Sequence, residues 1–296
     1  MAPPMSVVTP SFNQARFIER TLCSVLEQGV AGLEYVVCDG GSTDGTLEVL
    51  RRYAGRLRFV SEGDRGQADA VNKGIAATSG EIVGWLNSDD VYYPGALAAV
   101  VRYFAQHPEV EAIYGDAHHI DEEDRVLEPY YTEDWDYERL KDVCYLCQPA
   151  VFLRRRLLDR FGPFDVGLRY CMDYEYWLRV GAHVPFARFP GFLAGSRLYA
   201  ANKTLGARVQ VHVEINDMMR RRLGSVPTRW IWNYAYAVID AARADRTRLH
   251  RHGTLFVRAV VFGFLRWRGY VPREVMGTLW STLTDSWKRG RRAGGA

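Results

Sequence analysis

The sequence lacks the segments that would export the chain or carry it across a membrane. Residues 1–4 contain no basic region leading into a long apolar run, so no secretory signal is evident. The longest apolar run of the C-terminal third, residues 255–265, is interrupted by Arg258 and is too short to span a bilayer. We therefore expect a cytoplasmic protein without a transmembrane helix.

Cysteine is scarce and unevenly placed. The five residues form an odd set, which is typical of reduced thiols. Cys144 and Cys147 form a C-x-x-C pair, but no second pair or histidine set at zinc spacing accompanies it. Buried packing thiols are the better interpretation.

Two common nucleotide-binding fingerprints are also missing. No glycine-rich G-x-G-x-x-G follows the first apolar strand, and no G-x-x-x-x-G-K-[ST] occurs anywhere. These absences argue against a dehydrogenase and against a P-loop kinase or GTPase. Any nucleotide phosphates must be held by other groups.

The first half of the chain alternates apolar strands with amphipathic helices. With 48% hydrophobic and 25% charged residues, the chain can bury a full core. Strands are predicted over residues 5–9, 33–39, 57–62 and 81–86, and helices over 15–28, 46–54, 66–79 and 94–107. This alternation predicts an α/β fold with a mostly parallel, Rossmann-like sheet and helices on both faces.

Polar residues collect where these strands end, in residues 9–13, 39–45, 62–67 and 87–90. Ligands of parallel sheets bind beyond the carboxyl ends of the strands, so a nucleotide site is expected there. The fourth of these loops, Asn87-Ser88-Asp89-Asp90, carries adjacent carboxylates. A turn and helix cap explain Ser88 and one aspartate, whereas a divalent cation, Mg²⁺ or Mn²⁺, explains both carboxylates and would hold the phosphates.

Four segments in this order resemble the motifs of family 2 glycosyltransferases with the GT-A fold. They are VVTPSFNQARFIERTLCSVLEQ, VVCDGGSTDGT, GQADAVNKGIAATSGEIVGWLNSDD and CMDYEYWLRVG. The resemblance covers about residues 4–200. It implies an inverting transfer of a sugar from a nucleoside-diphosphate sugar, most commonly a UDP-sugar, to a glycan or polyprenyl-linked acceptor.

The resemblance also implies roles for individual residues. Asp90 would be the direct metal ligand, with Asp89 beside the metal or ribose, and Asn87 departs from the family's D-x-D motif. Asp173 is the expected general base, preferred over Glu175. Apart from the resemblance, Trp177 and Gln148 are candidates for acceptor contacts, since sugars stack on aromatic faces. Tyr199 occupies a position where many relatives carry a histidine, so no metal ligand is assigned there. The donor-binding candidates are Pro10, Ser11, Asn13, Asp39, Gln67, Asp69, Asn72, Asn87, Ser88 and Asp89.

Each candidate also has a purely structural interpretation. Asp39 suits an Asx turn before two glycines, and Asp173 suits a helix N-cap. Gln67, Asp69 and Asn72 suit the solvated first turns of a helix, and Trp177 suits a packed core.

The C-terminal region differs in charge from the rest. Residues 220–292 hold 16 Lys or Arg against 4 Asp or Glu, a net +12, while the other residues hold 22 against 31, a net −9. Basic residues interleaved with five tryptophans are typical of a helix at an anionic membrane surface, and a helical subdomain with a basic face is the alternative. No nucleic-acid-binding motif accompanies the charge.

We therefore expect a GT-A catalytic domain over residues 1–204, with a nucleotide-sugar half at about 1–115 and an acceptor half at about 116–204. A basic, aromatic helical region follows over 205–296. A non-catalytic sugar-nucleotide or glycan-binding module and a nucleotidyltransferase remain as alternatives. The sequence leaves the sugar, the base, the acceptor and the oligomeric state open.

Overall fold

The computed structural model describes residues 3–200, 202, 206–243 and 251–281. The chain divides into two compact units, Met1–Asn202 and Lys203–Ala296, and each is described by itself. The domain boundary expected after residue 204 lies two residues from this division.

The first unit begins with the predicted alternation of strands and helices. Its elements are β1 (Met5–Ser11), α1 (Ile18–Leu26), β2 (Glu34–Asp39), α2 (Thr46–Arg52), β3 (Arg58–Ser61), α3 (Gln67–Ala76), β4 (Ile82–Trp85), β5 (Val91–Tyr92) and α4 (Ala96–Gln106). It continues with β6 (Ala112–Ile120), β7 (Val126–Pro129), α5 (Tyr137–Asp142), the 3₁₀ turn η1 (Gln148–Ala150), β8 (Val151–Arg154), α6 (Arg155–Phe161), α7 (Met172–Gly181) and β9 (Ala187–Arg197).

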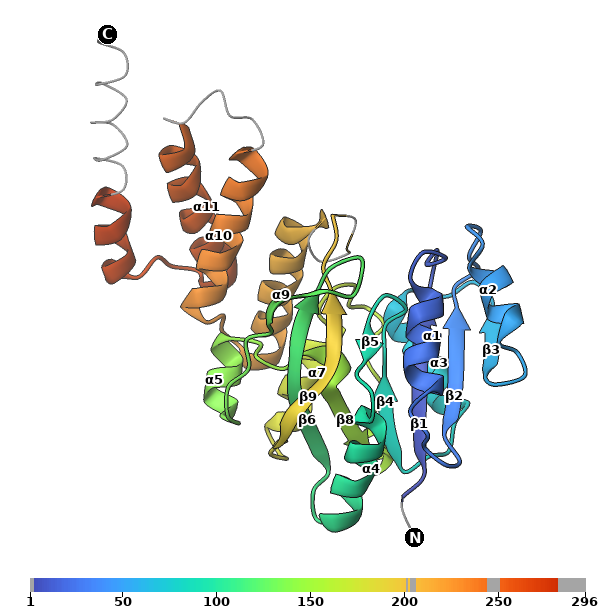
Figure 1. Cartoon of the computed structure of the whole chain (residues 1–296). Coiled ribbons are helices and arrows are strands. Elements are labelled where there is room, and N and C mark those ends of the chain that lie inside the picture. The colour runs from blue at the N-terminus through green and yellow to red at the C-terminus, as the bar shows by residue number, and fades with distance from the viewer. Residues whose placement is uncertain (1–2, 201, 203–205, 244–250, 282–296) are drawn as a thin grey trace. The chain divides into compact units, whose positions relative to one another are not determined.

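These strands form one sheet in the order β3-β2-β1-β4-β8-β6-β9-β5, with β7 paired to β6 (Figure 1). Strands β1 to β4 run parallel to one another, which confirms the expected Rossmann-like half. Beyond β4 the sheet is mixed, because β8 is antiparallel to both β4 and β6 while β9 is parallel to β6. The α/β class is therefore confirmed.

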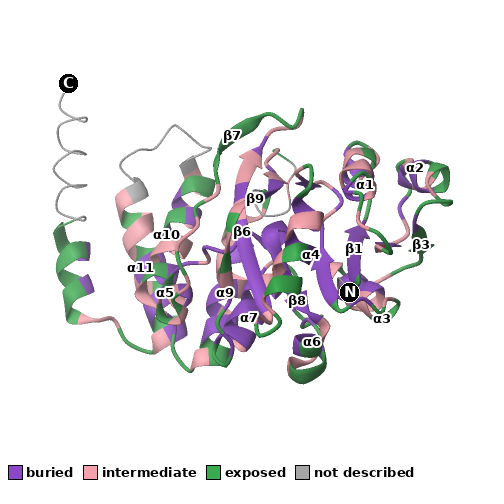
Figure 2. Ribbon diagram, turned by 60° about the horizontal axis from the view of Figure 1, so that its bottom comes forward, coloured by how far each residue is buried: buried purple, intermediate pink, exposed green. Residues whose placement is uncertain are grey.

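Alternation along β1 places helices on both faces of the sheet. Val7 belongs to a large core cluster that also contains Ile18 and Leu22 of α1. Val8 faces the other way and meets α3, where a Cβ on Gly74 would lie 2.2 Å from its Cγ1. Only glycine allows α3 to approach β1 this closely. Figure 2 shows the resulting pattern, with buried strands such as β1 and β6 and exposed outer helix surfaces.

The second unit consists of helices, as expected. They are α9 (Arg208–Leu223), α10 (Thr228–Arg243) and α11 (Arg251–Arg268), and residues 273–281 are also helical. In the described part of the chain, no helix combines the length and apolarity needed to cross a membrane.

Candidate active site

The ends of β1, β2 and β3 form one polar edge of the sheet. The parallel register pairs Ser11 with Asp39 and Asp39 with Ser61. The Asp39 carboxylate is buried and accepts hydrogen bonds from the backbone N–H and hydroxyl of Ser42 at 2.9 and 2.5 Å and from the Ser61 hydroxyl at 2.7 Å. The backbone N–H of Gly41 donates to it as well. Asp39 is therefore held rigidly, partly by the Asx turn that the sequence suggested.

The turn after β1 is fastened to the loop after β2. Asn13 has a left-handed backbone with φ of 52°, its N–H donates to the Ser42 hydroxyl, and its Oδ1 accepts from Thr43 N–H. Pro10 is buried within β1, and the buried Ser11 hydroxyl finds no hydrogen-bond partner in the described part of the chain. Ser11 therefore contributes an unsatisfied polar atom at this edge.

Phe12, which sequence reasoning passed over, lies between these residues. Its side chain is 60% exposed, and its Cδ2 would lie 3.4 Å from a Cβ on Gly40. An exposed aromatic ring beside the Asp39 loop is the kind of platform on which a nucleobase stacks. The sequence feature that could have identified Phe12 is that it is an aromatic residue in a loop otherwise made of small and polar residues.

The two carboxylates of the acidic loop have different surroundings. Asp90 is only 4% exposed, and its oxygens accept hydrogen bonds from the Arg197 backbone N–H at 2.8 Å and from Asn87 Nδ2 at 3.2 Å. Burial, together with the charge of Asp89, raises the pKa of Asp90 well above its ordinary range. This placement does not support Asp90 as the direct metal ligand. Asp89 is the carboxylate of this loop that is partly exposed.

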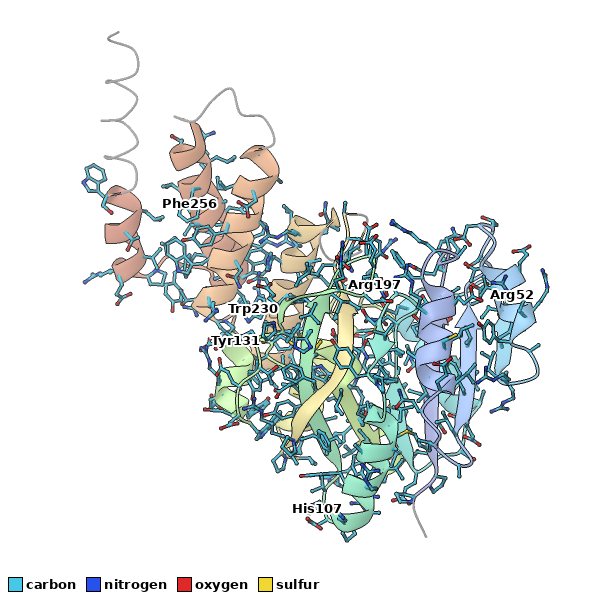
Figure 3. All side chains as sticks on the ribbon, in the orientation of Figure 1. Arg52, His107, Tyr131, Arg197, Trp230 and Phe256 are labelled. Atoms are coloured by element: carbon cyan, nitrogen blue, oxygen red, sulfur yellow. The ribbon has the colours of Figure 1, made fainter. Side chains whose placement is uncertain are left out.

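Arg197 lies at the end of β9 (Figure 3), and it contacts the acidic loop. Its buried guanidinium donates to the Asp89 carbonyl at 2.6 Å and to the Asp121 carbonyl, and it pairs with Asp124. The guanidinium also lies over the Phe17 ring at 4.9 Å. No short-range sequence pattern links residues 89 and 197, so this contact could not be predicted.

Three side-chain amides connect the acidic loop to its neighbours. Gln67 Nε2 donates to Asn87 Oδ1 at 2.7 Å, and Asn87 Nδ2 donates to Gln148 Oε1 at 2.9 Å. Gln148 Nε2 in turn donates to the Trp85 carbonyl at 2.8 Å. Gln148 therefore orients Asn87, which is a supporting position rather than the acceptor contact suggested by the sequence. Ser88 is buried within the same loop.

The side chains of the other two candidates on α3, Asp69 and Asn72, form hydrogen bonds with other residues of this chain. The Arg65 guanidinium donates to Asp69 at 2.9 Å and is the main cause of a lowered Asp69 pKa. Asn72 exchanges two hydrogen bonds with the backbone of Phe164, donating at 2.9 Å and accepting at 3.0 Å. Asn72 thus fastens the loop before α7, and this placement does not support a donor contact.

Asp173 and Glu175, the two candidate bases, differ sharply in accessibility. Glu175 is 1% exposed and pairs with Arg179 at 2.8 Å, so it is committed to the core. Asp173 is partly exposed in the first turn of α7, where Cys171 rather than Asp173 is the N-cap. Burial and then the charge of Asp90 raise the Cys147 pKa, and Asp173 contributes further.

Trp177 lies wholly within the core. It is 0% exposed and stacks on Trp85 with ring centroids 5.5 Å apart. A buried ring presents no face to a sugar, so this placement does not support the suggested acceptor contact.

Tyr199 completes the site next to Asp89. Its hydroxyl donates to Asp89 Oδ2 at 2.9 Å, and its ring packs on Phe17 at 4.9 Å. Burial and the nearby Asp89 charge raise the pKa of Tyr199 to about 12, so the phenol stays protonated and keeps donating.

Within the described ranges, no three His, Cys, Asp or Glu side chains gather to hold a metal ion. Within the acidic loop, Asp89 is the carboxylate that would hold a divalent cation, because Asp90 is buried. Mg²⁺-type sites with one or two carboxylates are completed by water and phosphate oxygens, and a single partly exposed aspartate fits that donor set.

Comparison with known proteins shows which family the sequence matches. The family model described as glycosyl transferase family 2 matches residues 6–162. A PGL/p-HBAD biosynthesis glycosyltransferase of Mycobacterium bovis is 30% identical over 183 residues, which are 60% of this chain and 70% of that protein. The chondroitin synthase of Escherichia coli is 27% identical over 230 residues, 75% of this chain but 33% of the synthase.

Solved structures share the fold. S. aureus TarS 1-349 in complex with UDP-GlcNAc has a TM-score of 0.61 at 15% identity, covering 98% of this chain and 92% of that chain. A mannosyltransferase from Pyrobaculum calidifontis in complex with GDP-Man and Mn²⁺ has a TM-score of 0.58 at 21% identity, covering 98% and 87%.

Proposed function

Since the chain belongs to glycosyl transferase family 2 and is a glycosyltransferase, we propose that it moves a sugar from a UDP-sugar, with inversion, to a glycan or polyprenyl-linked glycan. The observation that carries the proposal is the position of Asp89 and Asp173. Both are partly exposed carboxylates, one in the acidic loop after β4 and the other in the first turn of α7.

The donor nucleotide would lie along the polar edge formed by β1 and β2. Phe12 would stack on the base, while Ser11 and the fixed Asp39 would offer hydrogen bonds to the base or ribose. A rigid carboxylate loses little conformational entropy on binding, which favours recognition. Pro10 and Asn13 would shape this edge through the backbone.

The diphosphate would lie at the acidic loop. A bound Mn²⁺ or Mg²⁺ supplies Lewis-acid stabilisation of the charge that develops on the leaving nucleoside diphosphate. Asp89 would hold that cation, and Tyr199 and Arg197 would fix the orientation of Asp89 through its side chain and its backbone. The hydrogen bond between Gln67 and Asn87 would hold the conformation of the acidic loop.

Asp173 would accept the proton of the acceptor hydroxyl. An inverting displacement needs the hydroxyl to attack from the face opposite the leaving group, with a base within hydrogen-bond reach. Asp173 lies in the first turn of α7, and its carboxylate is partly exposed. Glu175 is unsuited because it is buried against Arg179.

A panel of sugar nucleotides tests this proposal. Thermal shift and hydrolysis would be measured for UDP- and GDP-sugars with Mn²⁺, with Mg²⁺ and with chelator, followed by NMR of the anomeric configuration of the product. We expect stabilisation by one UDP-sugar only when the cation is present, and an inverted product. Binding that is equal in chelator, or a retained configuration, would refute the metal or the stereochemical part respectively.

A further inference from the structure

Helix α11 presents a mixed apolar and basic face to solvent. Arg258, Phe262 and Leu265 are exposed and lie four and three residues apart, which places them on one side of the helix. The opposite side packs into the second unit through Val260 and Phe264, both fully buried. The exposed side chains are therefore not needed for the core of this unit.

The following helical residues, 273–281, repeat this arrangement. Val275 and Leu279 are buried, whereas Met276 is 52% and Trp280 is 72% exposed. Arg273 is exposed one turn before Met276. We call the set Arg258, Phe262, Leu265, Arg273, Met276 and Trp280 the aromatic–basic surface.

Single exposed apolar residues are normal, but this surface gathers four large ones within 19 residues and adds arginines. Arg258 and Arg273 are both exposed, so their guanidinium groups can reach a partner. The partner must accept both apolar side chains and positive charge.

The net charge of the region favours an anionic bilayer over a second copy of the chain as the partner. Residues 220–292 carry a net +12, so a symmetric contact between two copies would bring like charges together. An anionic bilayer offers the opposite charge and a boundary region in which Trp, Phe and Leu are stabilised. Arginine stems can lie along the acyl boundary while the guanidinium groups reach lipid phosphates.

We propose that the aromatic–basic surface docks on anionic lipid bilayers. Phe262, Leu265 and Trp280 insert at the level of the headgroups, and Arg258 and Arg273 contact lipid phosphates. This docking is independent of transferase chemistry. It would bring the enzyme to a lipid-linked acceptor by confining it to the surface that contains that acceptor.

Liposome co-sedimentation of the full chain, without any sugar nucleotide, tests the proposal. Vesicles of phosphatidylcholine alone are compared with vesicles containing phosphatidylglycerol, at low and high salt. We expect binding to the anionic vesicles that weakens with salt, because exposed charges are screened beyond about 8 Å at physiological ionic strength. Leu265→Glu/Trp280→Glu should bind at least tenfold more weakly.

A matched control is Val60→Glu/Val126→Glu, which adds the same two charges at apolar positions of similar exposure in the first unit. It should bind as the parent does, and both variants should keep the parent melting temperature. Equal binding to neutral vesicles, or equal loss in both variants, would overturn the proposal. So would a parent dimer, seen by light scattering, that Leu265→Glu/Trp280→Glu converts to monomer, because a second copy would then occupy the surface. A failed transferase assay would leave this result unaffected.

Discussion

The hydroxyl of Tyr199 donates a hydrogen bond of 2.9 Å to Oδ2 of Asp89, joining the end of the first unit's last strand to the acidic loop. Arg197, two residues earlier, donates to the Asp89 carbonyl. The side chain and the backbone of Asp89 are thus fixed by one short segment. Partners of this kind set how a carboxylate presents its oxygens to a cation.

Tyr199→Phe should weaken metal-dependent nucleotide binding by roughly tenfold to a hundredfold, because Asp89 loses the donor that orients it. Calorimetric titration of UDP in Mn²⁺ and in chelator measures this. Tyr53→Phe is the matched control, since its phenol also donates to a carboxylate, Glu19 Oε1 at 3.0 Å, on another part of the unit. Equal losses of nucleotide affinity in the two variants would show that Tyr199 does not orient Asp89 for metal binding.

Substitutions at Asp89 and at Asp90 should have different effects, the first on nucleotide binding and the second on stability. Asp89→Asn should abolish the cation dependence of nucleotide binding and change the free energy of unfolding little, because this side chain is partly exposed. Asp90→Ala should lower the free energy of unfolding by roughly 2–4 kcal/mol, because it leaves the Arg197 N–H and Asn87 Nδ2 without their buried acceptor. Urea denaturation measures the free energy of unfolding of each variant, and UDP titration measures its nucleotide binding. A fully stable Asp90→Ala that alone loses cation dependence would return the ligand role to Asp90.

Asp173→Asn should reduce transfer by about two to four orders of magnitude while donor binding survives, because the amide cannot accept the acceptor's proton. Single-turnover transfer and donor titration measure the two effects. Glu175→Gln should instead cost about 1–3 kcal/mol of stability, because the Arg179 guanidinium loses its charged partner and keeps only the carbonyls of Phe161 and Pro163. Retained turnover in Asp173→Asn would assign the proton to another carboxylate.

Glu34 lies at the start of β2, at the opposite end of the strands from the polar edge. Its lowered pKa predicts that stability depends on pH. Burial alone would raise its pKa, but hydrogen bonds from Ser79 N–H, the Ser6 and Ser79 hydroxyls and Gly80 N–H lower it from 4.5 to about 2. A depressed folded pKa means that the ionised form stabilises the folded state. The contribution is present above the unfolded value and is lost as the pH falls through about 2.

Glu34→Gln should therefore be less stable than the parent by about 2 kcal/mol at pH 7, and the difference should shrink steadily between about pH 5 and pH 2. Thermal melts across this range provide the measurement. Glu48→Gln, at a largely exposed carboxylate, should show no such trend. A difference that stays constant with pH would mean that Glu34 acts through packing rather than charge.

The order of strands and helices in residues 5–106 was determined by the sequence. Apolar runs of period two and helical spacing are local, and the expected segments coincide with β1 to β4 and α1 to α4. The polar edge could also be predicted, because parallel strands deliver their carboxyl ends to one side, as the Ser11–Asp39–Ser61 register confirms.

Tertiary structure decided which of these polar residues remain accessible. Asp89 and Asp90 are neighbours with the same side chain, yet Asp90 accepts the Arg197 N–H while Asp89 is oriented by Arg197 and Tyr199, all from more than 100 positions away. Asn72 was proposed from its motif position and Trp177 from its aromatic ring, but their partners, Phe164 and Trp85, come from distant segments. Local patterns specify where a chain turns and which face is apolar, whereas desolvation of a particular carboxylate or ring depends on segments that meet only when the sheet closes.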